Sequence, residues 1–229
     1  MATAINREPA PRLDNLSLPP KLPIRDQWLS LPRDIKQPRT DFLKVLQARR
    51  SVTGEDVGIN DLSSLLWHST ALRERHGSGR FGIPWESRPA PSAGGLHPIS
   101  IIVLPLGAPS TAGEYLPDLH GIAAIHFGAV EANRASVEEM LGCHHGTTLQ
   151  FACDLALLDA CYSNPETLMW RDSGALANTI TLVATWLGLK SVILGRIGTD
   201  ILSAGGMNGR LVGAGAVHIG SVAAGSDET

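Results

Sequence analysis

The chain has 229 residues, of which 43% are hydrophobic and 18% charged, enough for one domain with a sizeable core. Its 19 Lys and Arg against 22 Asp and Glu give a formal net charge of -3. This balance argues against nucleic-acid binding, because no basic excess would neutralise a phosphate backbone. Glycine and proline follow no repeat, which excludes a fibrous protein.

The cysteines and the apolar runs indicate the cellular compartment in which we expect the protein. Cys143, Cys153 and Cys161 lack the C-x-x-C spacing of a zinc or redox site, and three thiols cannot all pair with one another. The N-terminus has no apolar signal region, and no apolar run approaches the roughly 20 residues of a membrane span. We therefore expect a soluble, cytoplasmic protein that has no membrane partner.

Residues 1–39 are predicted to form an N-terminal arm, because they hold seven of the 15 prolines and show neither a helical nor a strand period. We expect this arm to lie along the domain or along a partner subunit, since it carries too many apolar residues for a solvated linker; a disordered tail is the alternative. The globular domain is predicted over residues 40–222, followed by a flexible tail over residues 223–229.

Two helices are predicted at the start of this domain. The first begins at Thr40 as its N-cap and runs through Arg50. The second begins near Asn60 and ends at Gly77. The apolar face of the first helix consists of Phe42, Leu43, Val45 and Leu46. A Gly- and Pro-rich stretch over residues 77–98 is expected to be irregular.

The rest of the chain alternates strands and helices. Strands are predicted at 99–106, 121–127, 149–158, 190–198 and 210–222, and a short amphipathic helix at 130–142. A long helix at 168–189 is almost continuously apolar, which is typical of burial on most faces. The order of elements indicates an α+β protein, or an α/β protein with a mixed sheet.

Several common sites are not supported by the sequence. Cys143, His144 and His145 are adjacent, so their side chains point apart, and no H-E-x-x-H motif is present; no metal site is predicted. The chain has no G-x-S-x-G motif of a serine nucleophile. The glycines near the C-terminus do not form the G-x-G-x-x-G of a dinucleotide site.

A cluster of polar residues ends the first predicted helix. Arg49, Arg50 and Ser51 offer two guanidinium groups and a hydroxyl, which can together clamp a phosphate monoester. An ordinary solvated helix end is the alternative interpretation.

A second segment of interest, residues 88–98, precedes a predicted core strand and reads RPAPSAGGLHP. Its prolines stiffen the backbone, and its glycines let main-chain N–H and C=O groups approach a flat ligand closely. A plain Pro/Gly loop is the alternative interpretation.

Taken in order, these segments resemble a known family. The motifs are R-R-S, a helix with S-S-L-L-W, P-S-A-G-G-L-H-P before a strand, D-S-G-A-L-A-N-T in a small-residue helix, and I-L-G-R-I-G. Together they resemble the FMN-dependent nitroreductase superfamily, and within it the SagB-type dehydrogenases, which oxidise thiazolines and oxazolines in modified peptides. The resemblance implies a mainly antiparallel mixed sheet flanked by helices, with the long apolar helix at a dimer interface.

The resemblance also implies the site residues. Arg49, Arg50 and Ser51 match the segment that binds the FMN phosphate and ribityl chain in this family. The family's flavin-facing loop, often supplied by the second subunit, corresponds to Pro91, Ser92, Ala93, Gly94 and Gly95. The strand-end turn whose backbone faces flavin N5 corresponds to Leu194, Gly195 and Arg196.

The sequence departs from the azoline-oxidising members. Their Lys-Tyr pair, which handles a proton, corresponds to Cys161 and Tyr162, so Tyr162 is the catalytic candidate and lacks the lysine beside it. The frequent E-A-G-H becomes D-S-G-A, the second basic residue after R-R-S becomes Thr53, and only Arg210 stands near the C-terminal phosphate clamp.

The leading hypothesis is therefore an FMN-dependent homodimeric oxidoreductase that transfers a hydride between a substrate and flavin N5. A SagB-type dehydrogenase acting on a peptide or natural-product intermediate, with biosynthetic partner proteins, is the first form of it. One alternative is a nicotinamide-dependent reductase of nitroaromatics or quinones. The other is a catalytically degenerate scaffold subunit of a biosynthetic complex.

Overall fold

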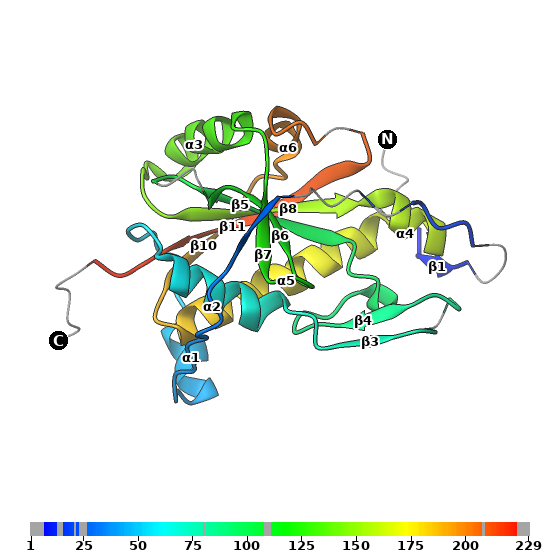
Figure 1. Cartoon of the computed structure of the whole chain (residues 1–229), viewed down its shortest axis with the longest axis horizontal. Coiled ribbons are helices and arrows are strands. Elements are labelled where there is room, and N and C mark those ends of the chain that lie inside the picture. Colours follow the sequence, from blue (N-terminus) through cyan, green and yellow to red (C-terminus); the bar gives the residue numbers. More distant parts are fainter. Residues whose placement is uncertain are drawn as a thin grey trace.

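The fold is a seven-stranded sheet with helices on both faces (Figure 1). The computed structural model describes residues 7–12, 16–20, 22, 27–79, 81–107, 111–207 and 209–223. The strands follow the order β10 (Lys190–Leu194), β11 (Leu211–Gly220), β8 (Thr147–Asp154), β5 (Ile99–Pro105), β6 (Gly113–Leu116), β7 (Gly121–Ala124) and β2 (Trp28–Ser30). All six neighbouring pairs are antiparallel, which confirms the mainly antiparallel sheet.

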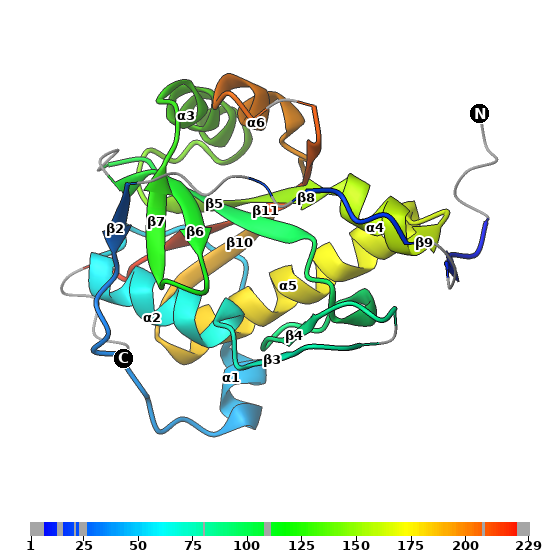
Figure 2. The same cartoon turned by 45° about the vertical axis from the view of Figure 1, so that its right-hand side comes forward.

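The helices form two layers. On one face lie α3 (Gly128–Leu141) and α6 (Thr199–Ala204); on the other lie α1 (Phe42–Ala48), α2 (Ile59–Thr70) and α5 (Glu166–Trp186) (Figures 1 and 2). The core is correspondingly split, because successive strand residues alternate between faces: Ile101 and Val103 of β5 pack toward α2 and α5, whereas Ile102 and Leu104 pack toward α3 and α6.

The long helix α5 occupies the predicted position, but only one side of it is buried. Leu176, Ile180 and Ala184 lie in the core, whereas Trp170 and Gly174 are exposed. The expectation of burial on most faces was therefore wrong for the single chain. The exposed residues of α5 are Glu166, Trp170, Arg171, Gly174 and Asn178, so Trp170 is the one large apolar side chain exposed on this helix.

Several predicted boundaries were wrong. The N-cap of α1 is Asp41, whose carboxylate accepts from the N–H of Leu43 at 2.8 Å, and not Thr40. Helix α2 begins after Gly58 without a side-chain cap and ends at Thr70. The residues predicted to continue α2 instead form β3 (Glu74–His76), which pairs with β4 (Trp85–Ser87) inside the stretch expected to be irregular.

The predicted strand over 149–158 is half strand and half helix. Strand β8 ends at Asp154, whose carboxylate caps α4 (Leu155–Cys161) by accepting from the N–H of Leu157. Strand β6 and helix α6 were not predicted. Both are short, and β6 has four residues only, which leaves too few positions for a period to be recognised.

Part of the predicted arm belongs to the folded unit. Strand β2 forms the edge of the large sheet by pairing with β7, and Leu31 is buried in the core. Strand β1 (Ala10–Pro11) pairs with β9 (Tyr162–Ser163). The arm therefore lies along the domain where it is described, and the domain division at residue 39 stays a prediction. Apart from Ala223, the predicted tail lies outside the described residues.

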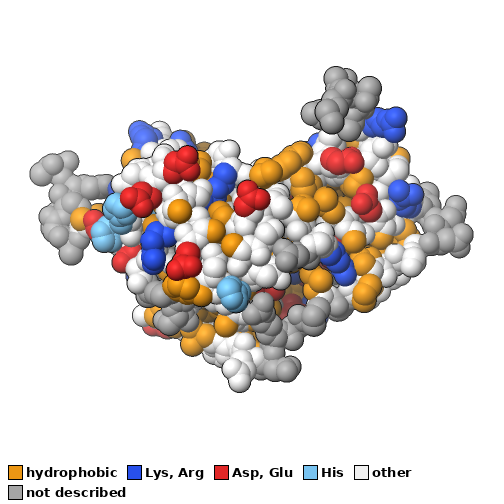
Figure 3. Space-filling model, turned by 90° about the horizontal axis from the view of Figure 1, so that it is seen from above, with side chains coloured by type: hydrophobic (Ala, Val, Ile, Leu, Met, Phe, Trp, Pro, Cys, Tyr) orange, Lys and Arg blue, Asp and Glu red, His pale blue; other side chains and the backbone are white. Residues whose placement is uncertain are grey.

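Three features of the described residues concern nucleic-acid, membrane and metal binding. Acidic and basic side chains are interspersed on the face that carries α3 and α6, with no continuous basic stripe (Figure 3). Within the described ranges, no helix combines the length and hydropathy that a membrane crossing needs. The same residues contain no group of three or more His, Cys, Asp or Glu side chains placed to hold a metal ion.

Candidate functional site

The first part of the candidate site lies where α1 meets the edge of the sheet. Ser51 forms a parallel bridge with Ser191 of β10, and the N–H of Val52 donates to the Ser191 carbonyl at 3.2 Å. Arg49 donates to the Ser51 hydroxyl oxygen at 3.4 Å, and Arg50 donates to the carbonyls of Gln47 and Arg49. These bonds fix the Arg49–Ser51 segment beside the start of β10.

The charge of this segment is not neutralised within the described part of the chain. No carboxylate there lies within salt-bridge distance of Arg49 or Arg50. The buried Ser191 hydroxyl has no hydrogen-bond partner among those residues. Two guanidinium groups without a described carboxylate partner are a feature of a surface that would accept an anion.

The second predicted segment, Leu194–Arg196, lies at the other end of β10. Leu194 lies three residue steps along the strand from Ser191, which corresponds to about 10 Å. A Cβ built on Gly195 would meet nothing within 4 Å, so the backbone there is open to a ligand. The structure thus places both predicted segments on one sheet edge.

The side chain of Arg196 does not face this edge. Its guanidinium donates to the side-chain oxygen of Asn133 on α3, on the other side of the sheet, at 2.5 Å. Burial lowers the pKa of Arg196 to about 10, and its Nε and Nη1 atoms are buried without a described partner. Only the backbone of this residue is therefore available at the candidate site.

The third predicted segment, Pro91–Gly95, is the loop that leads into β5. Gly94 and Gly95 have φ values of +62° and +67°, which L side chains rarely adopt, and His97 has φ +46°. The N–H of Ala93 and the hydroxyl of Ser92 both donate to the carboxylate of Asp172 on α5. The loop is thus held in an uncommon backbone conformation by a helix.

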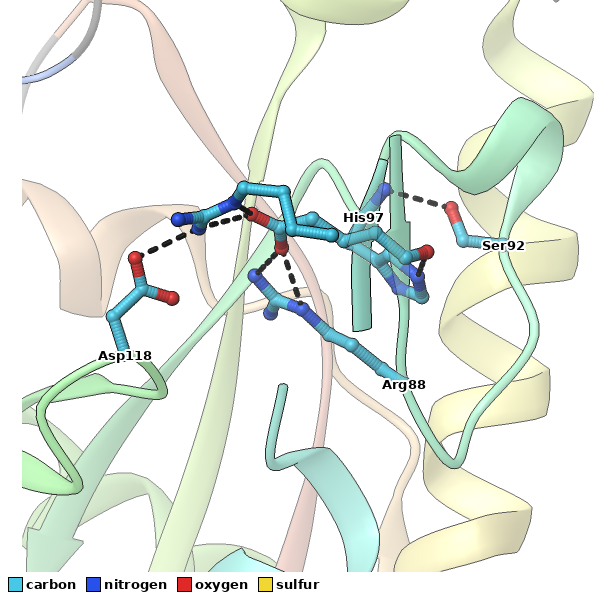
Figure 4. Close-up of polar contacts among 6 residues, drawn as sticks. Arg88, Ser92, His97 and Asp118 are labelled. Carbon is cyan, nitrogen blue, oxygen red and sulfur yellow. Dashed lines mark hydrogen bonds and ion pairs between the residues drawn. The ribbon is translucent and has the colours of Figure 1, made fainter. Parts of the chain in front are cut away.

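A second set of bonds holds the base of this loop (Figure 4). Arg88 donates to Glu86 Oε2 through Nε at 3.0 Å and through Nη2 at 2.5 Å, and Arg75 donates to Glu86 Oε1 and to Asp118. Burial raises the pKa of Glu86, but the hydrogen bonds and charges of both arginines outweigh burial, and the pKa is lowered. Glu86 therefore stays ionised and tethers both arginines.

His97 contributes to the same network as a neutral group. Its Nε2 atom lies 3.0 Å from the Glu86 carbonyl, which can only accept, so Nε2 carries the hydrogen. Burial lowers the pKa of His97 to about 4, and the charge of Arg88 acts in the same direction. The Nδ1 atom is then left as an acceptor.

Tyr162, the catalytic candidate, lies beside the loop in the same chain. Its hydroxyl oxygen is 3.0 Å from the Cβ that would be built on Gly94, and its ring packs edge-on against Phe81 at 5.1 Å. The side chain is 6% exposed. Cys161, at the position of the family's lysine, is fully buried, and burial raises the pKa of its thiol. Cys161 cannot replace the lysine as a cation.

Two hollows adjoin the loop. An open hollow of about 420 Å³ lies on one side and is lined by Trp85, Gly94, Gly95 and His97, among others. A more enclosed cavity of about 130 Å³ lies between the loop, the end of α2 and the start of β5; its walls include Thr70, Arg88, Tyr115 and Asp172. The loop therefore has space on two sides, and its position decides the shape of both hollows.

The predicted segments lie at different points along α5 in the single chain. Arg49–Ser51 lies near the C-terminal end of α5, where Ser51 bridges Ser191, and the Pro91–Gly95 loop is bonded to Asp172 near the start of this helix. The Leu194–Arg196 turn lies toward the start as well, because Leu194 pairs with Ala216 and the neighbouring Ala214 carbonyl accepts from Ser173 of α5. Helix α1 packs against α5. The helical rise separates Asp172, which holds the loop, from Trp186 at the end of α5 by roughly 20 Å.

Asp172 and Glu86 were missed as contributors to the site. Asp172 stands in D-S-G-A, which was noted only as a departure from E-A-G-H. Its bond to Ser92 joins residues 80 positions apart, and no local pattern indicates such a contact.

The fold is that of solved nitroreductase structures. A protein from Ralstonia eutropha described as a candidate nitroreductase matches over 95% of this chain and 100% of its own, with a TM-score of 0.66 and 20% identity. The Escherichia coli microcin synthetase McbBCD complex, solved with truncated pro-MccB17 bound, matches over 86% of this chain and 79% of that chain (TM-score 0.59, 15% identity).

A third structure was solved with FMN. This candidate nitroreductase from Desulfovibrio desulfuricans matches over 83% of this chain and 91% of that chain, with a TM-score of 0.52 and 18% identity. No protein-family model and no curated protein sequence matches the chain. At these identities, the comparisons establish a nitroreductase-like α+β fold.

Proposed function

We propose that the protein is an FMN-dependent oxidoreductase whose site is completed by a second copy of the chain. The observation that carries this proposal is the sheet edge along β10. Among the described residues, Arg49 and Arg50 offer cationic donors without carboxylate partners at one end, and an open backbone at Gly195 lies at the other, about 13 Å along the strand from Ser191. A phosphate at one end and a flat ring at the other fit this arrangement.

The residues present fit FMN in their chemistry. The planar guanidinium groups suit a phosphate, and Ser51 supplies a hydroxyl beside them. A backbone N–H of the Leu194–Arg196 turn would donate to the N5 side of the flavin and stabilise the negative charge of the reduced flavin.

The homodimer is supported by exposed apolar surface on one side of the molecule. Phe42 and Leu43 of α1 are 66% and 60% exposed, and Ile193 of β10 and Trp170 of α5 are 55% and 48% exposed. All four side chains belong to elements on the α1 and α5 side of the sheet, which a partner chain would cover in the proposed dimer. A partner covering this face would also bring its own Pro91–Gly95 loop, which within one chain lies at the far end of α5.

In this proposal the chain's residues bind, orient and move a proton. When bound, FMN supplies a two-electron acceptor that takes a hydride at N5. The Pro91–Gly95 loop lies against the ring and excludes water from it. Tyr162, beside Gly94, exchanges a proton with the substrate through its hydroxyl.

The substrate class proposed first is a peptide or natural-product intermediate, as for SagB-type dehydrogenases. It is supported by the motif order and by the similarity to the McbBCD complex, which was solved with a peptide precursor bound. A reductase that uses a nicotinamide donor is the second enzymatic form. The similarity to a Staphylococcus epidermidis protein described as a candidate NAD(P)H:FMN oxidoreductase, with a TM-score of 0.53, supports it at the level of fold.

One observation favours a different class of function. Cys161, at the position of the family's lysine, is buried, and burial raises the pKa of its thiol, so this position supplies no cation. A scaffold subunit of a biosynthetic complex would not need a Lys-Tyr pair. The visible spectrum of the protein separates the two, because a scaffold without flavin would be colourless and would take up no added FMN.

The test is a double substitution, Arg49→Ala with Ser51→Ala, compared with Lys44→Ala. Lys44 is exposed on α1, so its substitution removes a charge from the same helix without touching the proposed clamp. We expect FMN affinity, measured by quenching of flavin fluorescence, to fall at least ~100-fold in the double variant, because charge-assisted bonds contribute about 1.5–3 kcal/mol each.

The control is expected to bind FMN like the unsubstituted protein. Full retention of bound flavin in the double variant would show that the phosphate is held elsewhere. A protein that binds no FMN at all would contradict the oxidoreductase proposal and leave the scaffold function.

A further inference from the structure

Asp172 is a buried carboxylate whose hydrogen bonds go to one loop. It lies near the start of α5 with 8% of its surface exposed. Its Oδ2 atom accepts from the Ser92 hydroxyl at 2.6 Å, and its Oδ1 atom accepts from the Ala93 N–H at 3.1 Å. No cation among the described residues pairs with it.

An ionised carboxylate is chemically suited to this position. Both neighbouring groups are donors, and a carboxylate only accepts. Burial raises the pKa of Asp172, while the bonds from Ser92 and Ala93 act in the opposite direction. Burying an anion without a nearby cation costs free energy. A carboxylate is therefore expected at such a position where the hydrogen bonds it accepts hold a neighbouring segment in place, which an apolar side chain could not do.

Ser92 connects Asp172 to the far end of the loop through hydrogen bonds. Its hydroxyl donates to Asp172, and its oxygen accepts from the N–H of His97 at 3.0 Å. Between these two residues, the Gly95 N–H donates to the Ser92 carbonyl and the Leu96 N–H to the Ala93 carbonyl. One carboxylate thus organises the whole turn from Ser92 to His97.

The turn needs such a restraint because its backbone is strained. His97 is not a glycine, yet it has φ +46°, and Gly94 and Gly95 are also in the left-handed region. A non-glycine residue there is disfavoured by roughly 1–2 kcal/mol, and glycines leave the chain free to adopt other conformations. On the far side, the Glu86 carbonyl accepts from His97 and fixes the end of the turn.

We infer that Asp172 is a positioning residue: it locks the Ser92–His97 turn onto α5 and thereby presets the surface that this turn presents to a ligand. The lock itself does not depend on any cofactor. Its consequence for flavin binding rests on the proposed function, in which this turn lies against the isoalloxazine.

The experiment compares Asp172→Asn with Ser173→Ala. Asparagine has the same shape, but it carries no charge and its NH2 group replaces one acceptor oxygen, so a donor faces either the Ser92 hydroxyl or the Ala93 N–H. Ser173 is the next residue on α5 and equally buried, and its hydroxyl donates to the Ala214 carbonyl of β11, away from the turn. Each variant therefore weakens or removes a buried hydrogen bond of α5. Only Asp172→Asn affects the bonds that hold the Ser92–His97 turn.

Two quantities are measured on the full-length protein. Hydrogen exchange of the Ala93 and His97 amides, measured without flavin, is expected to become at least ~10-fold faster in Asp172→Asn and to stay unchanged in Ser173→Ala. The dissociation constant of FMN is expected to rise by roughly 10-fold in Asp172→Asn only. Ser92→Ala, which removes the same link from the loop side, is expected to behave like Asp172→Asn and serves if that variant does not fold.

The outcomes separate the lock from the proposed function. Unchanged exchange in Asp172→Asn, or equal effects in Ser173→Ala, would overturn the lock. Faster exchange with unchanged FMN affinity would overturn the consequence for flavin while the oxidoreductase proposal stands. If the unsubstituted protein binds no FMN, the proposed function fails, and the exchange measurement alone decides whether Asp172 locks the turn.

Discussion

At the scale of single residues, Gly94 shows how tightly the loop and the catalytic candidate are packed. Its φ of +62° lies in the left-handed region, and a built Cβ would approach Phe81 to 2.8 Å and the Tyr162 hydroxyl to 3.0 Å. Gly82 also has a left-handed φ, +69°, but a Cβ there would meet nothing within 4 Å. An L side chain would be strained at either position, and the two positions differ in available space.

This difference gives a prediction. We expect Gly94→Ala to destabilise the protein by about 2–4 kcal/mol, because backbone strain and overpacking add, and Gly82→Ala by about 1–2 kcal/mol from strain alone. Urea unfolding followed by tryptophan fluorescence measures both. Equal losses would mean that Tyr162 and Phe81 can move away from Gly94, and that the tyrosine is not held against the loop.

At the scale of elements, α1 has the amphipathic pattern expected for it but buries only one residue of its apolar face. Val45 is buried, whereas Phe42, Leu43 and Leu46 are exposed. The seven residues of α1 are too few for a stable isolated helix. Its packing on α5 is therefore its described support, and cover from a second copy would add to it.

The corresponding prediction concerns assembly. Phe42→Glu with Leu46→Glu is expected to convert a dimer into a monomer in sedimentation velocity, because two charges would be buried without partners in the contact. Met140→Glu is the control, since Met140 is 41% exposed on α3, on the other face of the sheet. A dimer that persists in the double variant would place the contact on another surface.

At the scale of the whole molecule, buried neutral histidines link stability to pH. Burial lowers the pKa of His97, His120 and His218, and the charge of Arg196 also lowers that of His218. His120 accepts from the Tyr115 hydroxyl at Nδ1, and its Nε2 lies 2.8 Å from the Ser63 hydroxyl. Protonation therefore favours the unfolded chain, in which each imidazole titrates near 6.5.

The sign follows from the direction of the pKa changes. The stabilising contribution of each neutral histidine is present above pH 6.5 and is lost as the pH falls toward the lower folded-state pKa. We expect His218→Gln to reduce the dependence of the unfolding free energy on pH below 6.5, by at most one proton or about 1.4 kcal/mol per pH unit. Urea titrations between pH 7 and pH 5 measure this slope. An unchanged slope would mean that His218 is not neutral in the folded protein.

Much of the fold could be predicted because its long elements carry their pattern locally. Strands β5 and β11, helix α3 and helix α5 all appear near their expected positions. The motif order led to the nitroreductase-like fold that the solved structures establish. Short elements were missed or misplaced, because three or four residues are too few to show a period: β3 is held by its pairing with β4, and β6 by its place between β5 and β7.

The sequence by itself determined the chemistry available: two adjacent arginines with a serine, a Pro/Gly loop, and a tyrosine without a lysine beside it. Only the tertiary structure decided how they are arranged. It placed Arg49–Ser51 and Gly195 along one sheet edge, put the loop and Tyr162 near the start of α5, and bonded Ser92 to Asp172. The physical reason is that periodicity and turn composition act between near neighbours, whereas these contacts join residues brought together only when the sheet and helices pack.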